Sequence, residues 1–189
     1  MTSMVTTVLP NGLSFEVPED SPLAKLHNPD RSWEGPSAKD RLRMLRGAKS
    51  IAVVGASANS ARASYFVSTY LLQSTDYTVY FVNPKATTTI LGHKVYPNLA
   101  SLPEVPDIVD VFRRAEDVPE VVDEAHAVGA RTLWVQLGIW NEEAARKAES
   151  FGMTVVMDRC IKIEHARFNG GLHLMGFDTG QITSRRTVR

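Results

Sequence analysis

The segment Ser50-Ile-Ala-Val-Val-Gly-Ala-Ser57 decides the fold, because a short, uninterrupted apolar run ends directly at a glycine turn. A continuous run of this kind, without strict alternation of polar residues, is typical of a strand covered on both faces of a parallel sheet. Similar runs follow at Thr78–Val82, Asp107–Phe112, Thr132–Gln136 and Thr154–Met157. Together with Ser50–Val54, they predict about five parallel strands.

Helices are predicted between these strands and before the first of them. The interval at about Arg62–Gln73 places apolar residues on one helical face, namely Ala63, Phe66, Val67, Tyr70 and Leu71. Three further helical segments each begin with a capping residue: Ser37–Arg46, Asp117–Gly129 and Asn141–Gly152. The interval Asn83–Pro106 holds turn residues and at most one helical turn, near Asn98–Ser101. This alternation predicts an α/β fold: a Rossmann-like, doubly wound open sheet with helices on both faces.

The ends of the chain differ from this regular part. Half of the ten prolines fall within residues 1–36, which we therefore expect to form an extended N-terminal arm. Residues 37–168 are expected to form the single Rossmann-like domain. Four glycines lie close together near the C-terminus, so residues 169–189 are expected to form an irregular tail.

Composition excludes several classes of protein. The chain has 189 residues, 43% of them hydrophobic, and 21 basic against 21 acidic residues, so its formal net charge is zero. This balance argues against a nucleic-acid binder or a basic membrane-surface helix. One cysteine cannot form an internal disulfide or a cysteine-rich zinc site. Without a signal-peptide pattern or a membrane-length apolar run, the expected location is the cytoplasm.

Catalytic signatures are missing from the sequence. None of the five histidines lies in an H-E-x-x-H pattern, and neither a G-x-S-x-G elbow nor a P-loop is present. His165, next to Glu164 in a short terminal helix, is expected to make a structural hydrogen bond. The sequence therefore gives no positive case for an enzyme and predicts no metal site.

Ligands of doubly wound sheets bind beyond the carboxyl ends of the strands. After the first predicted strand, Gly55, Ala56 and Ser57 form a turn that allows close backbone approach, and the next helix offers free N–H groups to an anion. The incomplete G-x-G-x-x-G pattern weakens the case for an ordinary dinucleotide site, and a tight turn without a ligand is the alternative.

Residues after the second strand favour a phosphorylated ribose. Val82, Asn83, Pro84 and Lys85 stand where a nicotinamide dinucleotide site would need an acidic residue. A lysine suits a phosphate instead, which both NADP and coenzyme A carry on a ribose. An exposed loop lysine without a ligand is the alternative.

The remaining strand ends add further candidates. Phe112, Arg113 and Arg114 follow the third strand, and the arginines could reach phosphates or project into solvent beside acidic neighbours. Gln136 can donate and accept hydrogen bonds after the fourth strand, and Gly138 permits close approach. The single thiol follows the fifth strand.

Six blocks occur in a characteristic order: GAS followed by an asparagine, VNP, ILGHKVYPNLASLP, DIVDVFR, WVQLGIWNEEA and GMTVVMDRCIKIEH. They resemble the small single-domain CoA-binding proteins, a family related to the CoA-binding domain of succinyl-CoA synthetase α subunits. The resemblance covers about Leu42 to Phe168 and leaves both flanks outside.

The resemblance implies that coenzyme A, or an acyl-CoA, binds at the strand ends. The implied pyrophosphate contacts are Gly55, Ala56 and Ser57, near Asn59 and with Arg62 in addition. The implied adenosine contacts are Val82, Asn83, Pro84 and Lys85, with Lys85 near the 3′-phosphate. The implied groove and pantetheine contacts are Phe112, Arg113, Arg114, Gln136, Gly138 and Ile139. Cys160 would stand near the thiol of the ligand, where a mixed disulfide is a hypothesis.

The resulting expectation is a non-catalytic coenzyme A-binding module: a carrier, a sensor or an accessory subunit. One alternative is an NADP-dependent reductase, and another is a scaffold that has the fold but no ligand. The predicted partner is the small-molecule ligand, while a protein partner or a homo-oligomer stays open.

Overall fold

The computed structural model describes residues 4–8, 14–18, 31–85 and 89–171. The chain forms two compact units, Met1–Glu34 and Gly35–Arg189. In the first unit, β1 (Met4–Val8) and β2 (Ser14–Pro18) pair antiparallel. The predicted N-terminal arm therefore contains a hairpin, and its residues 9–13 and 19–30 lie outside the described residues. Most of the predicted tail, residues 172–189, also lies outside them.

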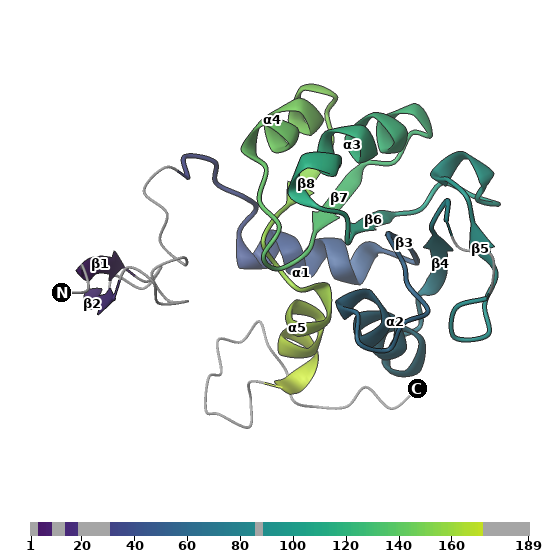
Figure 1. Ribbon diagram of the computed structural model, residues 1–189, viewed down its shortest axis with the longest axis horizontal. Helices are drawn as coiled ribbons and strands as arrows, with labels where there is room; N and C mark the ends of the chain where they lie inside the picture. Colours follow the sequence, from purple (N-terminus) through teal and green to yellow (C-terminus); the bar gives the residue numbers. More distant parts are fainter. Residues whose placement is uncertain (1–3, 9–13, 19–30, 86–88, 172–189) are drawn as a thin grey trace. The chain divides into compact units, whose positions relative to one another are not determined.

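The second unit contains an all-parallel sheet of six strands (Figure 1). Their spatial order is β5-β4-β3-β6-β7-β8, so the chain starts in the middle and winds outward in both directions. The strands are β3 (Ser50–Val54), β4 (Thr78–Val82), β5 (Val95–Tyr96), β6 (Ile108–Val111), β7 (Thr132–Val135) and β8 (Thr154–Val156). This topology confirms the predicted Rossmann-like open sheet.

One strand is additional to the five apolar runs of the sequence. β5 has only two residues, which pair with Phe81 and Val82 of β4. A strand this short at a sheet edge leaves no periodic signal, because half-exposed residues and turns surround it. The helical turn that the sequence predicted nearby is confirmed: Leu99–Ser101 forms a 3-10 turn capped by the Asn98 side chain.

Two predicted helix caps are confirmed and one is wrong. Ser37 caps α1 (Ala38–Gly47), and Asn141 caps α4 (Glu142–Ser150), each by accepting a backbone N–H. Asp117 makes no capping hydrogen bond at α3 (Val118–Ala127). Its carboxylate instead accepts hydrogen bonds from the Arg114 guanidinium at 3.2 Å.

The helix α2 (Ala63–Ser74) differs from the predicted apolar face at two positions, because Ala63 and Phe66 are both exposed. Val67 and Leu71 are buried as expected, but the side chain of Phe66 is 61% exposed. The buried face of α2 is formed by Ser64, Val67, Ser68 and Leu71, and Phe66 lies outside it. The exposed side chain of Phe66, at the carboxyl end of the sheet, is therefore available to contact another molecule.

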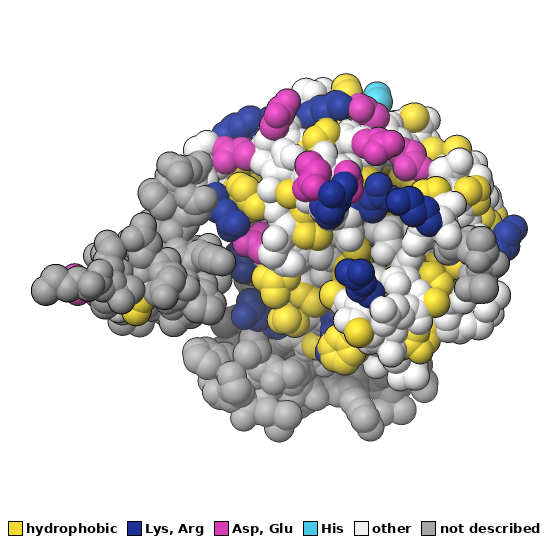
Figure 2. Space-filling view, viewed as in Figure 1, with side chains coloured by type: hydrophobic (Ala, Val, Ile, Leu, Met, Phe, Trp, Pro, Cys, Tyr) yellow, Lys and Arg dark blue, Asp and Glu magenta, His cyan; other side chains and the backbone are white. Residues whose placement is uncertain are grey.

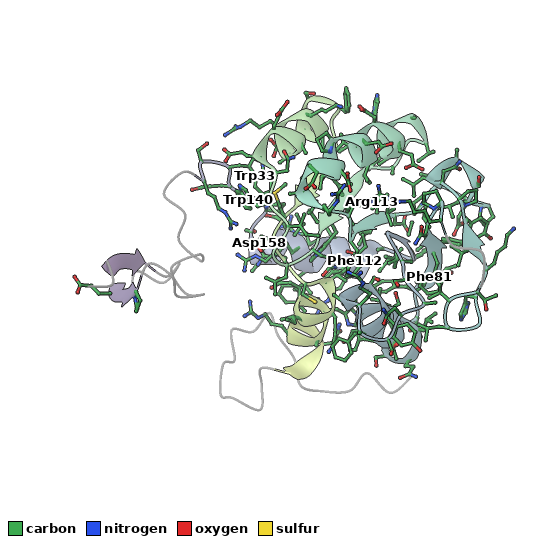
Figure 3. All side chains as sticks on the ribbon, viewed as in Figure 1. Trp33, Phe81, Phe112, Arg113, Trp140 and Asp158 are labelled. Atoms are coloured by element: carbon green, nitrogen blue, oxygen red, sulfur yellow. The ribbon has the colours of Figure 1, made fainter. Side chains whose placement is uncertain are left out.

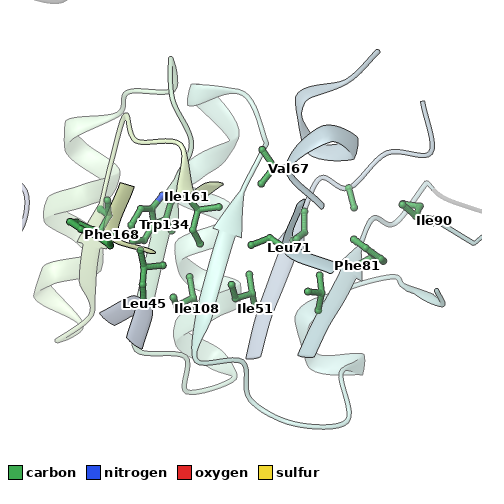
Figure 4. Close-up of a cluster of buried hydrophobic side chains, with 14 of the residues drawn as sticks. Leu45, Ile51, Val67, Leu71, Phe81, Ile90, Ile108, Trp134, Ile161 and Phe168 are labelled. Atoms are coloured by element: carbon green, nitrogen blue, oxygen red, sulfur yellow. The ribbon is translucent and has the colours of Figure 1, made fainter. Parts of the chain in front are cut away.

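The core lies between the sheet and the helices α1, α2 and α5 (Ile161–Ala166), as Figure 4 shows. Its largest fully buried side chains include Trp134, Phe81, Ile51 and Leu71. Each such side chain stabilises the fold by about 1.5–3 kcal/mol through burial. The helices α3 and α4 pack together and contact β6 and β8, respectively. No helix in the described part of the chain is long and apolar enough to cross a membrane.

His165 on α5 has the structural role that the sequence predicted. Its Nδ1 lies 2.9 Å from the hydroxyl of Tyr70, and the Asn169 amide nitrogen lies 3.0 Å from its Nε2. The rings of Tyr70 and Tyr77 meet the imidazole edge-on. Burial lowers the pKa of His165, so the imidazole is held neutral between α2 and α5.

Candidate functional site

A pocket of about 570 Å³ opens at the carboxyl ends of the central strands. Its wall comes from the turn after β3, the start of α2, the ends of β6 and β7, and the start of α5. The lining residues are Gly55, Ser57, Arg62, Ala63, Ser64, Phe66, Val67, Phe112, Gln136, Leu137, Ile139, Cys160 and Ile163. Seven of the residues proposed from sequence are thus brought together: Gly55, Ser57, Arg62, Phe112, Gln136, Ile139 and Cys160.

Gly55 is required by the shape of the first turn. Its φ of +85° lies in the left-handed region, and a Cβ there would come within 3.2 Å of the backbone carbon of Phe112. Both conditions exclude a larger residue without strain. Its N–H donates to Val82 O at 2.9 Å, which fixes the turn against β4.

The start of α2 gives the pocket an anion-binding character. Arg62 occupies the N-cap position, and its side chain does not cap the first turn. Uncapped N–H groups at a helix start attract anions, and the exposed guanidinium adds a full positive charge. Asn59 shapes the preceding loop: its Oδ1 accepts from Ala61 N, and its own N–H donates to Ser57 Oγ. Asn59 itself does not line the pocket.

The segment after β4 lies beside the pocket rather than in its wall. Asn83 Nδ2 donates to Ala56 O at 2.8 Å, and Asn83 Oδ1 accepts from Lys85 N at 2.9 Å. Ala56 and Val82 are buried, and their backbone carbonyl oxygens accept hydrogen bonds that stabilise the turn. Pro84 and Lys85 are exposed, which leaves the lysine ammonium accessible from solvent.

The two arginines after β6 do not line the pocket. Arg114 is exposed and pairs with Glu116 at 2.9 Å and Asp117 at 3.2 Å. The hydrogen bonds from Arg114 lower the pKa of Asp117. Arg113 is half-buried; its Cδ lies near Gly55, and its Nε is 3.6 Å from Asp117. Figure 3 shows Phe112 and Arg113 beside the carboxyl end of β6.

A buried acidic residue supports the floor of the pocket. Asp110 of β6 has no exposed surface, and its Oδ1 accepts a hydrogen bond from Gln136 Nε2 at 2.6 Å. Asp110 Oδ2 has no partner among the described residues. Burial raises the pKa of Asp110 to about 8. Sequence reasoning missed this pair, although a carboxylate inside the apolar run Asp107–Phe112 was a visible signal.

A hydrogen bond joins the loop after β7 to the loop after β8. Gly138 has a φ of +83° and donates its N–H to Asp158 Oδ1 at 2.6 Å. It therefore holds the loop and does not line the pocket. The neighbouring side chains of Leu137 and Ile139 do line it. Ile139 N donates to Gln136 O at 3.1 Å, which closes the turn that carries them.

Exposed apolar side chains surround one end of the pocket. Phe66, Leu137 and Ile163 are 61%, 59% and 51% exposed, and all three line it; we call these three residues the apolar rim. Lys162 Nζ lies 3.7 Å from the centre of the Phe66 ring. Figure 2 shows hydrophobic side chains gathered over the surface formed by α2 and α5. Sequence reasoning missed the rim, because it placed Phe66 on one apolar helix face together with Val67 and Leu71.

The lining combines polar and apolar residues. Gly55, Ser57 and Arg62 form a polar region that suits a phosphate, and the rim forms an apolar region. Within the described residues, no group of three His, Cys, Asp or Glu side chains could hold a metal ion. The fold and the pocket together define a Rossmann-like domain with a candidate ligand site at its strand ends.

Comparison with known proteins gives the family. Residues 49–166 match the family described as CoA binding domain, and the chain belongs to it. The uncharacterized protein YneT of Bacillus subtilis (strain 168) is 39% identical over 133 residues, which cover 70% of this chain and 97% of YneT. These findings confirm the resemblance seen in the sequence blocks.

Solved structures agree with this assignment. A hypothetical protein from Pyrococcus horikoshii OT3 has a TM-score of 0.66 and 36% identity, covering 75% of this chain and 98% of that one. A dinucleotide forming acetyl-coenzyme A synthetase 1 from Ca. Korarchaeum cryptofilum has a TM-score of 0.51 and 28% identity. That match covers 57% of this chain but only 25% of the synthetase. The chain is therefore similar to one part of this larger acetyl-coenzyme A synthetase.

Proposed function

We propose that the chain binds coenzyme A or an acyl-CoA in the strand-end pocket and acts as a non-catalytic carrier, sensor or accessory module. The observation that carries the proposal is the pocket between the Gly55 turn and the start of α2, in a chain that belongs to the CoA binding domain family. The diphosphate of the ligand would bind at Gly55, Ser57 and Arg62, where backbone N–H groups and a guanidinium suit negative charge.

The adenosine would lie toward the end of β4, with its 3′-phosphate near the exposed ammonium of Lys85. Lys85→Ala is expected to weaken coenzyme A binding more than binding of 3′-dephospho-coenzyme A. Lys39→Ala, at an exposed position of α1, is the matched control and should affect neither ligand. Equal losses for both ligands in Lys85→Ala would show that this lysine does not recognise the 3′-phosphate.

The apolar rim favours a ligand with an apolar end. An acyl chain that leaves the pocket across Phe66, Leu137 and Ile163 would bury surface that is exposed in the free protein. Each buried methylene contributes about 0.8 kcal/mol. Affinity is therefore expected to rise from coenzyme A to acetyl-CoA and further with longer acyl chains. Equal affinity throughout the series would show that the acyl chain does not bind at the apolar rim.

A binding module is favoured over an enzyme because no histidine, carboxylate, lysine or tyrosine lines the pocket in the described part of the chain. General acid–base chemistry needs such a group within hydrogen-bond reach of the substrate. The partial match to an acetyl-coenzyme A synthetase supports an accessory role, since there the similar region is one quarter of the chain. The cytoplasm remains the proposed location.

Calorimetric titration with coenzyme A, acetyl-CoA, NADP and NAD tests the proposal. We expect binding of the two coenzyme A species and no comparable binding of NADP or NAD. Tight binding of NADP without coenzyme A would overturn the proposal and favour the reductase. Absence of binding to all four ligands would favour a scaffold that has no ligand.

A further inference from the structure

An ammonium group lies at the apolar rim of the pocket. Lys162 is the second residue of α5 and directly precedes Ile163 of the rim. Its Nζ is 3.7 Å from the centre of the Phe66 ring and 5.8 Å from that of the Tyr70 ring, so the side chain reaches from α5 across to α2. Phe66 and Ile163 both line the pocket. A positive charge is therefore held at the edge of the apolar rim.

The charge of Lys162 has no acidic partner in the described part of the chain. None of the salt bridges between described residues includes it. The carboxylate of Glu164, on the same helix, is buried and pairs with Arg41 at 2.8 Å and Arg167 at 3.4 Å. No described aspartate or glutamate lines the pocket. An anionic group of a ligand would therefore meet no competing carboxylate at Lys162.

Stacking on Phe66 leaves part of the ammonium available. An ammonium has three N–H donors, and a single aromatic face covers only one side of the group. The side chain of Phe66 is 61% exposed, so a ligand group can reach the ammonium without displacing core residues. Contact with the ring also restricts the flexible lysine side chain, which reduces the entropy lost when an anion binds.

We propose that the pocket selects acyl-CoA thioesters of dicarboxylic acids, a ligand class that rests on the proposed function. With the diphosphate at Arg62 and the start of α2, the acyl chain would cross the apolar rim, and its far carboxylate would bind Lys162 Nζ. The methylene groups between the thioester and the carboxylate supply the apolar segment for Phe66 and Ile163. The carboxylate matches the ammonium in charge and accepts its N–H groups.

A monocarboxylic acyl chain differs from a dicarboxylic one only at its far end. It ends in a methyl group, which offers the ammonium of Lys162 no acceptor. Both kinds of chain gain from burial against the rim, but only the dicarboxylic chain gains from the charge. The contribution of Lys162 is therefore a difference between two thioesters that have the same number of carbons.

Calorimetry with matched pairs of thioesters measures this difference. The pairs are glutaryl-CoA with pentanoyl-CoA, adipoyl-CoA with hexanoyl-CoA, and suberoyl-CoA with octanoyl-CoA. Lys162→Met keeps an aliphatic side chain against Phe66 and removes the charge. The ratio of dicarboxylic to monocarboxylic affinity should be about fivefold higher in the wild type than in Lys162→Met for at least one chain length. A high salt concentration should reduce this difference, because salt screens the ion pair.

Lys94→Met is the matched control. Lys94 Nζ lies 4.6 Å from the centre of the Tyr96 ring at β5, so this variant also removes a charge from an aromatic face. Lys94 does not line the pocket, and the affinity ratio of the variant should equal that of the wild type. Effects of either substitution on folding or on the coenzyme A portion act on both members of a pair and cancel in the ratio. An equal fall of the ratio in both variants would assign the effect to net charge and overturn the proposal.

The same titrations separate the two proposals. Equal affinity ratios in the wild type and Lys162→Met at all three chain lengths, with coenzyme A still bound, would overturn the dicarboxylic ligand class and leave the proposed function. No binding of coenzyme A or of any thioester would remove both.

Discussion

The buried carboxyl group of Asp110 makes the stability of the protein depend on pH. Its carboxyl group is completely buried, and burial raises its pKa to about 8, against about 3.9 for an unfolded aspartate. Between these two values, the folded chain holds one proton more than the unfolded chain. Stability from this group is therefore fully present below about pH 4 and is lost progressively as the pH rises toward 8.

The substitution Asp110→Asn removes the titration and keeps the shape of the protonated side chain. The asparagine oxygen can still accept from Gln136 Nε2, and its amide group replaces the carboxyl hydroxyl. A one-proton difference corresponds to about 1.4 kcal/mol per pH unit. From about pH 5 to pH 7, the wild type should therefore lose about 3 kcal/mol of unfolding free energy relative to the variant.

Urea denaturation followed by tryptophan fluorescence at several pH values measures this difference. Titrations of other groups occur in both proteins and cancel in the comparison. Asp123→Asn, at an exposed position that pairs with Lys147, is the control and should change stability by less than about 1 kcal/mol at every pH. A constant difference between wild type and Asp110→Asn across this range would show that Asp110 is ionised in the folded state, which would refute the reasoning.

Three further substitutions test the turn, the core and the buried histidine. Gly55→Ala should cost about 1–3 kcal/mol in urea denaturation and weaken coenzyme A binding, because φ is +85° and Phe112 is close; unchanged affinity would contradict a role for this turn. Leu71→Ala should cost about 2–5 kcal/mol through an unfilled cavity, and a loss below about 1 kcal/mol would mean that the core relaxes around it. Tyr70→Phe should cost about 1 kcal/mol by leaving His165 Nδ1 without its hydroxyl partner, which the same denaturation assay detects.

Most of the fold could be predicted from sequence because strands buried on both faces leave continuous apolar runs. The β3 run and its glycine turn are local features, so their meaning does not depend on distant residues. β5 could not be predicted, because two half-buried residues become a strand only by pairing with β4. The capping prediction for Asp117 was wrong for a similar reason. Its sequence position fits an N-cap, but its carboxylate accepts hydrogen bonds from the Arg114 guanidinium instead.

The candidate site also has features that the sequence predicts and features that it does not. Gly55 and Gln136 follow strands directly, so the topology alone brings them to one edge of the sheet. The pairing of Gln136 with Asp110 depends on which face of two adjacent strands each side chain occupies, and no spacing rule marks it. The apolar rim depends on which face of α2 packs against the core, and Phe66 lies outside that face. Arg114 follows β6 at the same edge of the sheet, and its guanidinium pairs with Glu116 and Asp117.

The hydrogen bond between Gly138 and Asp158 has a consequence for the thermodynamics of ligand binding. It links the loop that carries Leu137 and Ile139 to the segment that leads into Cys160, and both of its residues have positive φ values. The two walls are thus fixed to each other before any ligand arrives. The protein therefore loses little conformational entropy in this wall when a ligand binds. This preorganisation should strengthen the binding of a flexible ligand segment such as pantetheine.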